Sequence, residues 1–141
     1  MTLHLLKLCV GAESLADLNA WVKEKAKAAR AKGKKPEIIH LTRQTPKRDS
    51  DILDGGSLYW VIKGVIAARQ PIIALRPSVK QGVPACAIVM APKVIPVAGR
   101  PHRPFQGWRY LSAKDAPPDL KGSDRNLPEA LRAELASLGL L

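Results

Sequence analysis

The sequence predicts a single α+β domain over residues 1–141, and two patterns support this prediction. Apolar residues recur at helical spacing from Leu15 to Ala29, which is typical of an amphipathic helix packed on a core. The central third of the chain holds short β-branched runs bounded by glycine, proline and polar residues, which is typical of strands. A chain of 141 residues suits one domain and buries enough surface to fold without disulfides or metal ions.

The amino-terminal half is expected to alternate strands and helices. Leu3–Val10 is an apolar run ended by Gly11, which predicts a buried strand. Ser14 then caps the expected helix Leu15–Ala31. A helical turn is expected at residues 51–54. The remaining strands are predicted at Ile38–Thr42, Leu58–Ile66, Pro71–Arg76, Pro84–Ala91 and Val94–Val97.

The predictions for the second half rest on the positions of prolines and on the alternation of apolar and polar residues. Residues 58–64 could instead be helical, because the alternation of apolar and polar residues is not clean there. Pro71 and Pro84 are expected at the starts of two strands that form a hairpin, because a strand start tolerates the missing N–H. The proline-rich stretch 92–118 predicts an irregular segment on the surface. A short amphipathic helix is expected to begin at Pro128 and to end at Gly139.

Positive charge is the unusual property of the composition. The chain has 23 Lys and Arg against 12 Asp and Glu, a net charge of +11. The excess is clustered, because no acidic residue lies between Asp54 and Asp115 while nine basic residues do. The expected helix and its tail carry seven more basic residues. Clustered positive charge is typical of nucleic-acid binders, and a solubility surface is the alternative interpretation.

Aromatic residues accompany this charge. Five of the six lie within the acid-free stretch, and bases stack on aromatic rings. Trp60 and Phe105 are expected in the core, whereas Trp108 and Tyr110 would share one face of a strand, opposite Arg109. We therefore expect RNA or another polyanion as the partner. The predicted contacts are Lys27, Lys34, Lys35, Arg43, Lys47, Arg48, Tyr59, Lys63, Arg69, Arg103, Trp108 and Arg109.

Two other functions remain open. A possible pocket of His40, Thr42 and Asp54 suggests an enzyme acting on a nucleotide or a phosphorylated substrate, with Arg43 as an anion-binding group. The stretch 92–118 suggests a protein-interaction module on a nucleoprotein complex. No catalytic motif and no metal-ligand spacing is visible, so we expect no cofactor and lean away from an enzyme.

The cysteines and the amino terminus suggest a cytoplasmic protein. Cys9 and Cys86 lie in apolar runs outside any metal motif, so free thiols in a reducing compartment are expected. Residues 1–10 lack the pattern of a signal peptide, and no apolar run is long enough to span a membrane.

Six strings carry a resemblance that spans nearly the whole chain: Leu3–Leu8, His40–Arg43, Pro46–Arg48, Leu53–Gly64, Arg69–Gln70 and Pro104–Leu111. Together they resemble an uncharacterised bacterial family, known mainly from alphaproteobacteria and classed as a domain of unknown function. The family has no assigned activity, so the resemblance implies no function. The order of elements is also similar to the small β-barrels of the PUA and ASCH type. That likeness implies a small curved antiparallel sheet or a partly open β-barrel, with an amino-terminal helix and a short carboxy-terminal helix, and a cleft for RNA or modified bases.

Overall fold

Seven strands and two helices make up residues 1–120, the part of the chain that the computed structural model describes. The helix expected from Pro128 lies outside these residues. In chain order the elements are β1 (Leu3–Leu8), α1 (Leu15–Ala31), β2 (Ile38–Thr42), α2 (Asp49–Ile52), β3 (Ser57–Ile62), β4 (Val65–Lys80), β5 (Val83–Met90), β6 (Ile95–Pro101) and β7 (Trp108–Ser112). The α+β class is therefore confirmed.

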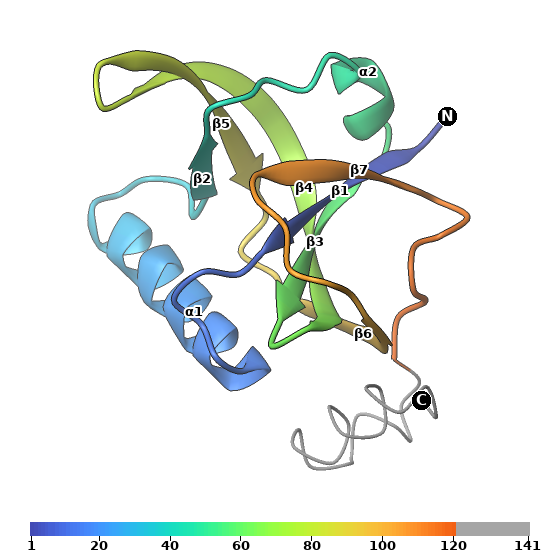
Figure 1. Cartoon of the computed structure of the whole chain (residues 1–141). Coiled ribbons are helices and arrows are strands. Elements are labelled where there is room, and N and C mark those ends of the chain that lie inside the picture. Colours follow the sequence, from blue (N-terminus) through green and yellow to red (C-terminus); the bar gives the residue numbers. More distant parts are fainter. Residues whose placement is uncertain (121–141) are drawn as a thin grey trace.

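The strands form one mixed sheet that curves but does not close (Figure 1). Its order is β2-β5-β4-β3-β1-β7, and β6 pairs with β4 outside this path. An entirely antiparallel sheet was the wrong expectation, because β1 pairs parallel to β3. Between these two strands the chain passes through α1, β2 and α2, and this long crossover lets it re-enter the sheet in the same direction.

The long strand β4 accounts for the curvature. Its first part pairs with β3 and β6, and its remainder pairs with β5. Register shifts interrupt the pairing with each of these neighbours, as between Ile72 and Ala74. Such bulges bend a strand and increase its twist. The distal half of β4 consequently curves away from β3, with β5 paired along it and β2 paired to β5 (Figure 1).

Several predicted strand limits need correction. Residues 58–66 are not one strand but nearly all of β3 and the start of β4, because Lys63 and Gly64 adopt φ of 48° and 76° and reverse the chain. Two consecutive positive φ values are typical of a tight hairpin turn. Pro71 lies inside β4, where a bulge follows it, rather than at a strand start. The stretch 92–118 is not irregular throughout, since it contains β6 and β7.

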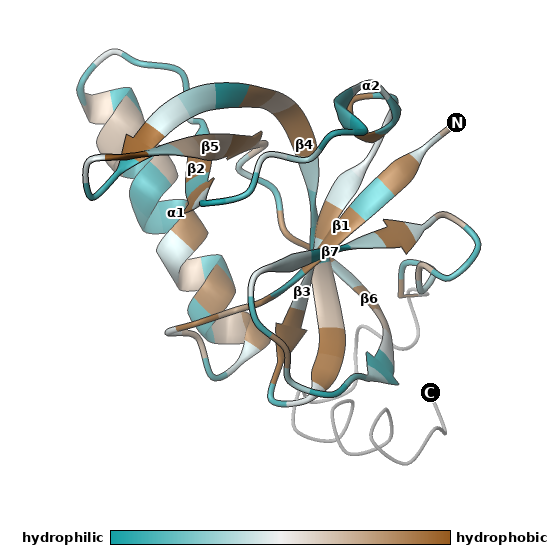
Figure 2. Ribbon diagram, turned by 45° about the horizontal axis from the view of Figure 1, so that its top comes forward, coloured by the Kyte–Doolittle hydropathy of each residue, from teal (hydrophilic) through white to brown (hydrophobic). Residues whose placement is uncertain are grey.

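Two apolar clusters lie on opposite faces of the central strands. Leu58 and Trp60 of β3 pack in the cluster that also holds Leu18 and Val22 of α1. The alternate residues Tyr59 and Val61 pack in a second cluster with Phe105 on the other face. All six residues of β3 are buried, which explains its unbroken apolar sequence. Figure 2 shows β3 largely brown, whereas α1 alternates between brown and teal.

The structure also tests the predictions of free thiols and of no membrane-spanning segment. Cys9 and Cys86 are both free thiols, as expected, and burial raises the pKa of Cys9 to about 11. Within residues 1–120, neither helix has the length and apolar character needed to cross a bilayer.

Candidate nucleic-acid interface

The two ends of the sheet meet through side chains. The indole N–H of Trp108, at the start of β7, donates to the backbone carbonyl of Gln44, just after β2, at 2.8 Å. The Tyr110 hydroxyl accepts from the backbone N–H groups of Lys47 and Arg48 at 3.1 and 3.3 Å. We call this contact between residues 44–48 and β7 the seam. It brings segments that are more than 60 positions apart in the chain into contact.

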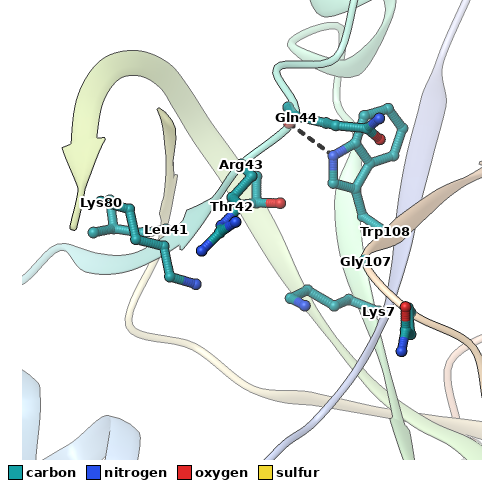
Figure 3. A pocket seen from close by; sticks show the side chains of 9 residues that line it. Lys7, Leu41, Thr42, Arg43, Gln44, Lys80, Gly107 and Trp108 are labelled. Atoms are coloured by element: carbon teal, nitrogen blue, oxygen red, sulfur yellow. Dashed lines mark hydrogen bonds between the residues drawn. The ribbon is translucent and has the colours of Figure 1, made fainter. Parts of the chain in front are cut away.

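A cavity of about 440 Å³ lies beside the seam, and we call it the seam pocket. Its walls come from β1, from β2 and the residues after it, from the end of β4, and from the turn into β7 (Figure 3). The volume falls in the range of small-molecule sites, which is about 300–1,000 Å³. The lining residues are Lys7, Leu41, Thr42, Arg43, Gln44, Lys80, Gln106, Gly107 and Trp108.

Among residues 1–120, three cationic side chains and no carboxylate line the seam pocket. Figure 3 shows the charged ends of Lys7, Arg43 and Lys80 directed toward one another. Burial, and then the charge of Lys80, lowers the pKa of Lys7 below its usual value. Arg43 is held in place by a 3.3 Å hydrogen bond from its guanidinium to the side-chain oxygen of Gln81 at the tip of the β4–β5 hairpin. Bringing these like charges together costs free energy that a bound anion would offset.

His40 lies on β2, close enough to the same lysines to be affected by their charge. Burial, and then the charges of Lys7 and Lys80, lowers its pKa to about 4, so the imidazole is neutral at pH 7. Its ring contacts Trp60 edge-on at 5.6 Å between centroids. The Nε2 atom is buried and has no hydrogen-bond partner within residues 1–120. An unsatisfied buried nitrogen is costly, and a ligand atom or a water molecule could satisfy it.

The structure brings together only part of the predicted site. Arg43, Thr42 and Trp108 line the seam pocket, and His40 neighbours its lysines. Lys47 is exposed on the seam. The remaining predicted residues do not line the pocket, although the backbone of Arg48 also contacts Tyr110 on the seam.

Three predicted arginines make contacts within the protein. The guanidinium of Arg48 pairs with Asp51 at 3.1 Å. Arg69 holds Asp119 through two bonds of 2.8 and 3.0 Å. Arg109 lies over the ring of Phe105 at 5.0 Å from its centroid. The rings of Trp108 and Tyr110 contact each other with 4.9 Å between their centroids, as expected for residues on one face of a strand.

The stacking role predicted for Tyr59 needs correction. Tyr59 is only 4% exposed and packs edge-on against His4, so it has no free ring face for a base. Trp60 and Phe105 are buried, as expected. Of the aromatic residues proposed to stack on a base, Trp108 is therefore the one that lines the pocket.

Other predicted residues are exposed but lie outside the seam pocket. Asp54, predicted as part of a possible pocket, lies 3.6 Å from the amino-terminal ammonium group, and its carbonyl accepts from Thr2. Of His40, Arg43 and Asp54, only Arg43 is among the residues that line the seam pocket. Exposed basic residues outside the pocket are Lys27 on α1, Lys34 and Lys35 before β2, Lys63 in the β3–β4 turn and Arg103 after β6.

The sequence analysis did not name several residues of the seam pocket. Lys7 could have been singled out from the sequence, because it is the one charged residue in the buried apolar run of β1. No sequence pattern distinguishes the other three, Lys80, Gln44 and Gln106, since they reach the pocket only through the curvature of the sheet and the turn into β7.

Comparison with known proteins adds a family but no activity. A family model described as "Protein of unknown function (DUF1489)" matches residues 5–141. No curated protein and no solved structure matches the chain.

Proposed function

The chain belongs to the DUF1489 family of proteins of unknown function, and from its site we propose that it binds single-stranded nucleic acid, RNA in preference to DNA, without catalysing a reaction. One observation carries this proposal. Lys7, Arg43 and Lys80 come from three distant segments and surround a single cavity, and no carboxylate of the described part of the chain lines it. Phosphate groups would neutralise these charges, and release of their counterions would favour binding.

The aromatic wall supports a single-stranded ligand. Trp108 lines the same cavity, and its hydrogen bond to Gln44 fixes the orientation of the ring. An unpaired base can stack on such a ring, whereas a base within a duplex cannot reach it. Stacking contributes about 1–3 kcal/mol per base.

The exposed basic residues outside the pocket would extend the contact with the backbone. Lys47 lies on the seam, so a strand entering the pocket would meet it. Under this proposal the protein works in the cytoplasm, alone or in a nucleoprotein complex. The curved open sheet beside one helix also agrees with a PUA- or ASCH-like fold, which stays part of the proposal.

A salt titration tests the function. We expect single-stranded RNA to bind with a log–log salt slope of about −2 or steeper, since each neutralised phosphate contributes about −0.7. Replacing Arg43→Gln should weaken binding and make the slope shallower by about 0.7. The matched control is Lys93→Gln, an exposed lysine outside the pocket that should leave the slope unchanged.

Two results would contradict the proposal. One is the absence of RNA binding at low salt, and the other is binding whose affinity does not change with salt. Equal losses in the Arg43→Gln and Lys93→Gln variants would show that binding follows net charge alone and not the seam pocket.

A further inference from the structure

We infer that the seam pocket receives the end of a nucleic-acid strand, with a terminal phosphate monoester among Lys7, Arg43 and Lys80 and the terminal base beside Trp108. This inference rests on the proposed function and specifies which part of the strand the site recognises. It is carried by the seam along one side of the pocket and by the size, the charge and the polar lining of the pocket.

The wall of the pocket favours an end over an internal segment. Gln44 and Trp108 both line the cavity and are bonded to each other at 2.8 Å. Tyr110 continues this closure by accepting bonds from the backbone of Lys47 and Arg48. A continuous strand would have to leave the pocket again, and the seam blocks that side. A strand end needs only to enter.

The volume matches one nucleotide better than several. The cavity of about 440 Å³ lies in the lower half of the range for small-molecule sites. Its lining offers one indole ring, that of Trp108, and therefore one stacking position. Neighbouring nucleotides would lie outside, along the exposed basic residues of the seam.

The charge favours a monoester over a diester. An internal phosphodiester carries one negative charge, whereas a phosphate monoester carries about −1.5 to −2 at pH 7. Three cationic groups meet here with no carboxylate from residues 1–120 in the lining, and Lys7 and Lys80 are close enough for one charge to disfavour the other. A dianion neutralises more of this repulsion than a monoanion does.

Polar groups around the pocket suit both parts of a terminal nucleotide. The side-chain amides of Gln44 and Gln106 each offer donors and an acceptor, which can pair with the edges of a base. The buried Nε2 of His40 lacks a partner within residues 1–120, and the neutral ring lies in the field of the same two lysines. His40 itself does not line the pocket, and its neutral ring adds no positive charge beside these lysines.

Competition between strand ends tests the inference. Single-stranded RNAs of one sequence would carry a 5′-phosphate, a 3′-phosphate or hydroxyl groups at both ends, and their affinities would be measured at one salt concentration. We expect one phosphorylated end to bind at least about tenfold more tightly than the hydroxyl-ended strand, roughly 1.4 kcal/mol. The 5′ and 3′ arms show which end enters.

Lysine variants test whether the preference for a phosphorylated end arises in the seam pocket. Lys7→Met and Lys80→Met should each remove most of the preference for the phosphorylated end while the remaining salt-dependent affinity persists. Lys93→Met should retain the preference. Thermal unfolding of each variant confirms that it is folded, and two lysines on different strands make the test independent of either one.

The outcomes separate the two proposals. Equal affinity for all three strands would overturn end recognition and leave RNA binding intact. A preference that survives both Lys7→Met and Lys80→Met would also overturn the placement in the seam pocket. Failure of every strand to bind would overturn both proposals.

Discussion

The indole N–H of Trp108 and the backbone carbonyl of Gln44 meet at 2.8 Å and join the two ends of an open sheet. Trp108 begins β7 at one end, and Gln44 follows β2 at the other. Because both residues also line the cationic cavity, this hydrogen bond links the shape of the sheet to the shape of the site.

Removing that N–H should loosen the seam. Trp108→Phe keeps an aromatic ring but cannot donate, so we expect the free energy of unfolding to fall by about 1–3 kcal/mol, as for a lost hydrogen bond and reduced packing. Amide hydrogen exchange should accelerate at Lys47 and Arg48, whose N–H groups depend on the adjacent Tyr110. Tyr110→Phe is the matched comparison, since it removes only that acceptor. Unchanged exchange in both variants would show that the seam does not hold residues 44–48 in place.

Replacing Lys7 should change stability and binding in opposite directions. Its lowered pKa means that the folded state disfavours the ammonium form. Lys7→Met should therefore raise the free energy of unfolding at pH 7 by up to about 1 kcal/mol, after allowance for solvent screening. The same variant should bind RNA more weakly.

The sign of the Lys7 effect has a pH check. Between the lowered pKa and 10.5 the unfolded chain binds more protons than the folded chain, so the stability of the unchanged protein rises with pH there. The advantage of Lys7→Met should shrink accordingly at alkaline pH in urea denaturation. A variant that is less stable at every pH and binds RNA normally would refute the assignment of Lys7 to the anion site.

His40 should make the protein less stable in mild acid. Its pKa is about 4 in the folded state against 6.5 as a reference value, so the unfolded chain binds more protons between these values. Stability should therefore fall as pH drops from 6.5 toward 4, by about 2 kcal/mol for this group once screening at its partly exposed edge is allowed for. Denaturant unfolding across this range measures the effect.

The variant His40→Gln should reduce this dependence without abolishing it. Burial, and then the charge of Arg69, also lowers the pKa of His4, whose Nδ1 accepts from the N–H of Ser57 at 2.9 Å. The carboxyl of Glu37 affects stability only at lower pH, because its hydrogen bond with Arg76 lowers its pKa below 4.5. An unaltered slope above pH 4.5 in His40→Gln would contradict the neutral, buried state assigned to His40.

Gly56 should tolerate no side chain. A Cβ there would overlap the backbone oxygens of Leu3 and Ile52, where α2 meets β1. Gly56→Ala should lower the free energy of unfolding by more than about 3 kcal/mol, because neither backbone can move away cheaply. In Gly82→Ala the Cβ has open space and only the positive φ of 76° is strained, so we expect a loss of about 1–2 kcal/mol. Thermal unfolding of both variants gives the comparison, and equal losses would contradict the overlap at Gly56.

Local patterns predicted much of the secondary structure because they depend on neighbouring residues. The helix Leu15–Ala31 and the strand Ile38–Thr42 were predicted with their observed limits. The hairpin around residues 78–82 was also predicted, and Gln81 and Gly82 form its turn. The turn at Lys63–Gly64 was missed, because two strong strand sequences flank it and conceal so short a signal.

The sequence by itself determined the amphipathic helix, the strand-rich middle, the clustering of basic residues along the chain and the burial of Trp60 and Phe105. Only the tertiary structure decided which cations meet, since Lys7, Arg43 and Lys80 approach one another through the bulged strand β4 and the seam at Trp108. The same folding pairs Arg48 and Arg69 with Asp51 and Asp119 and buries Tyr59. The physical reason is range: periodicity and turn propensity act over a few residues, whereas the convergence of charges depends on how a whole sheet bends.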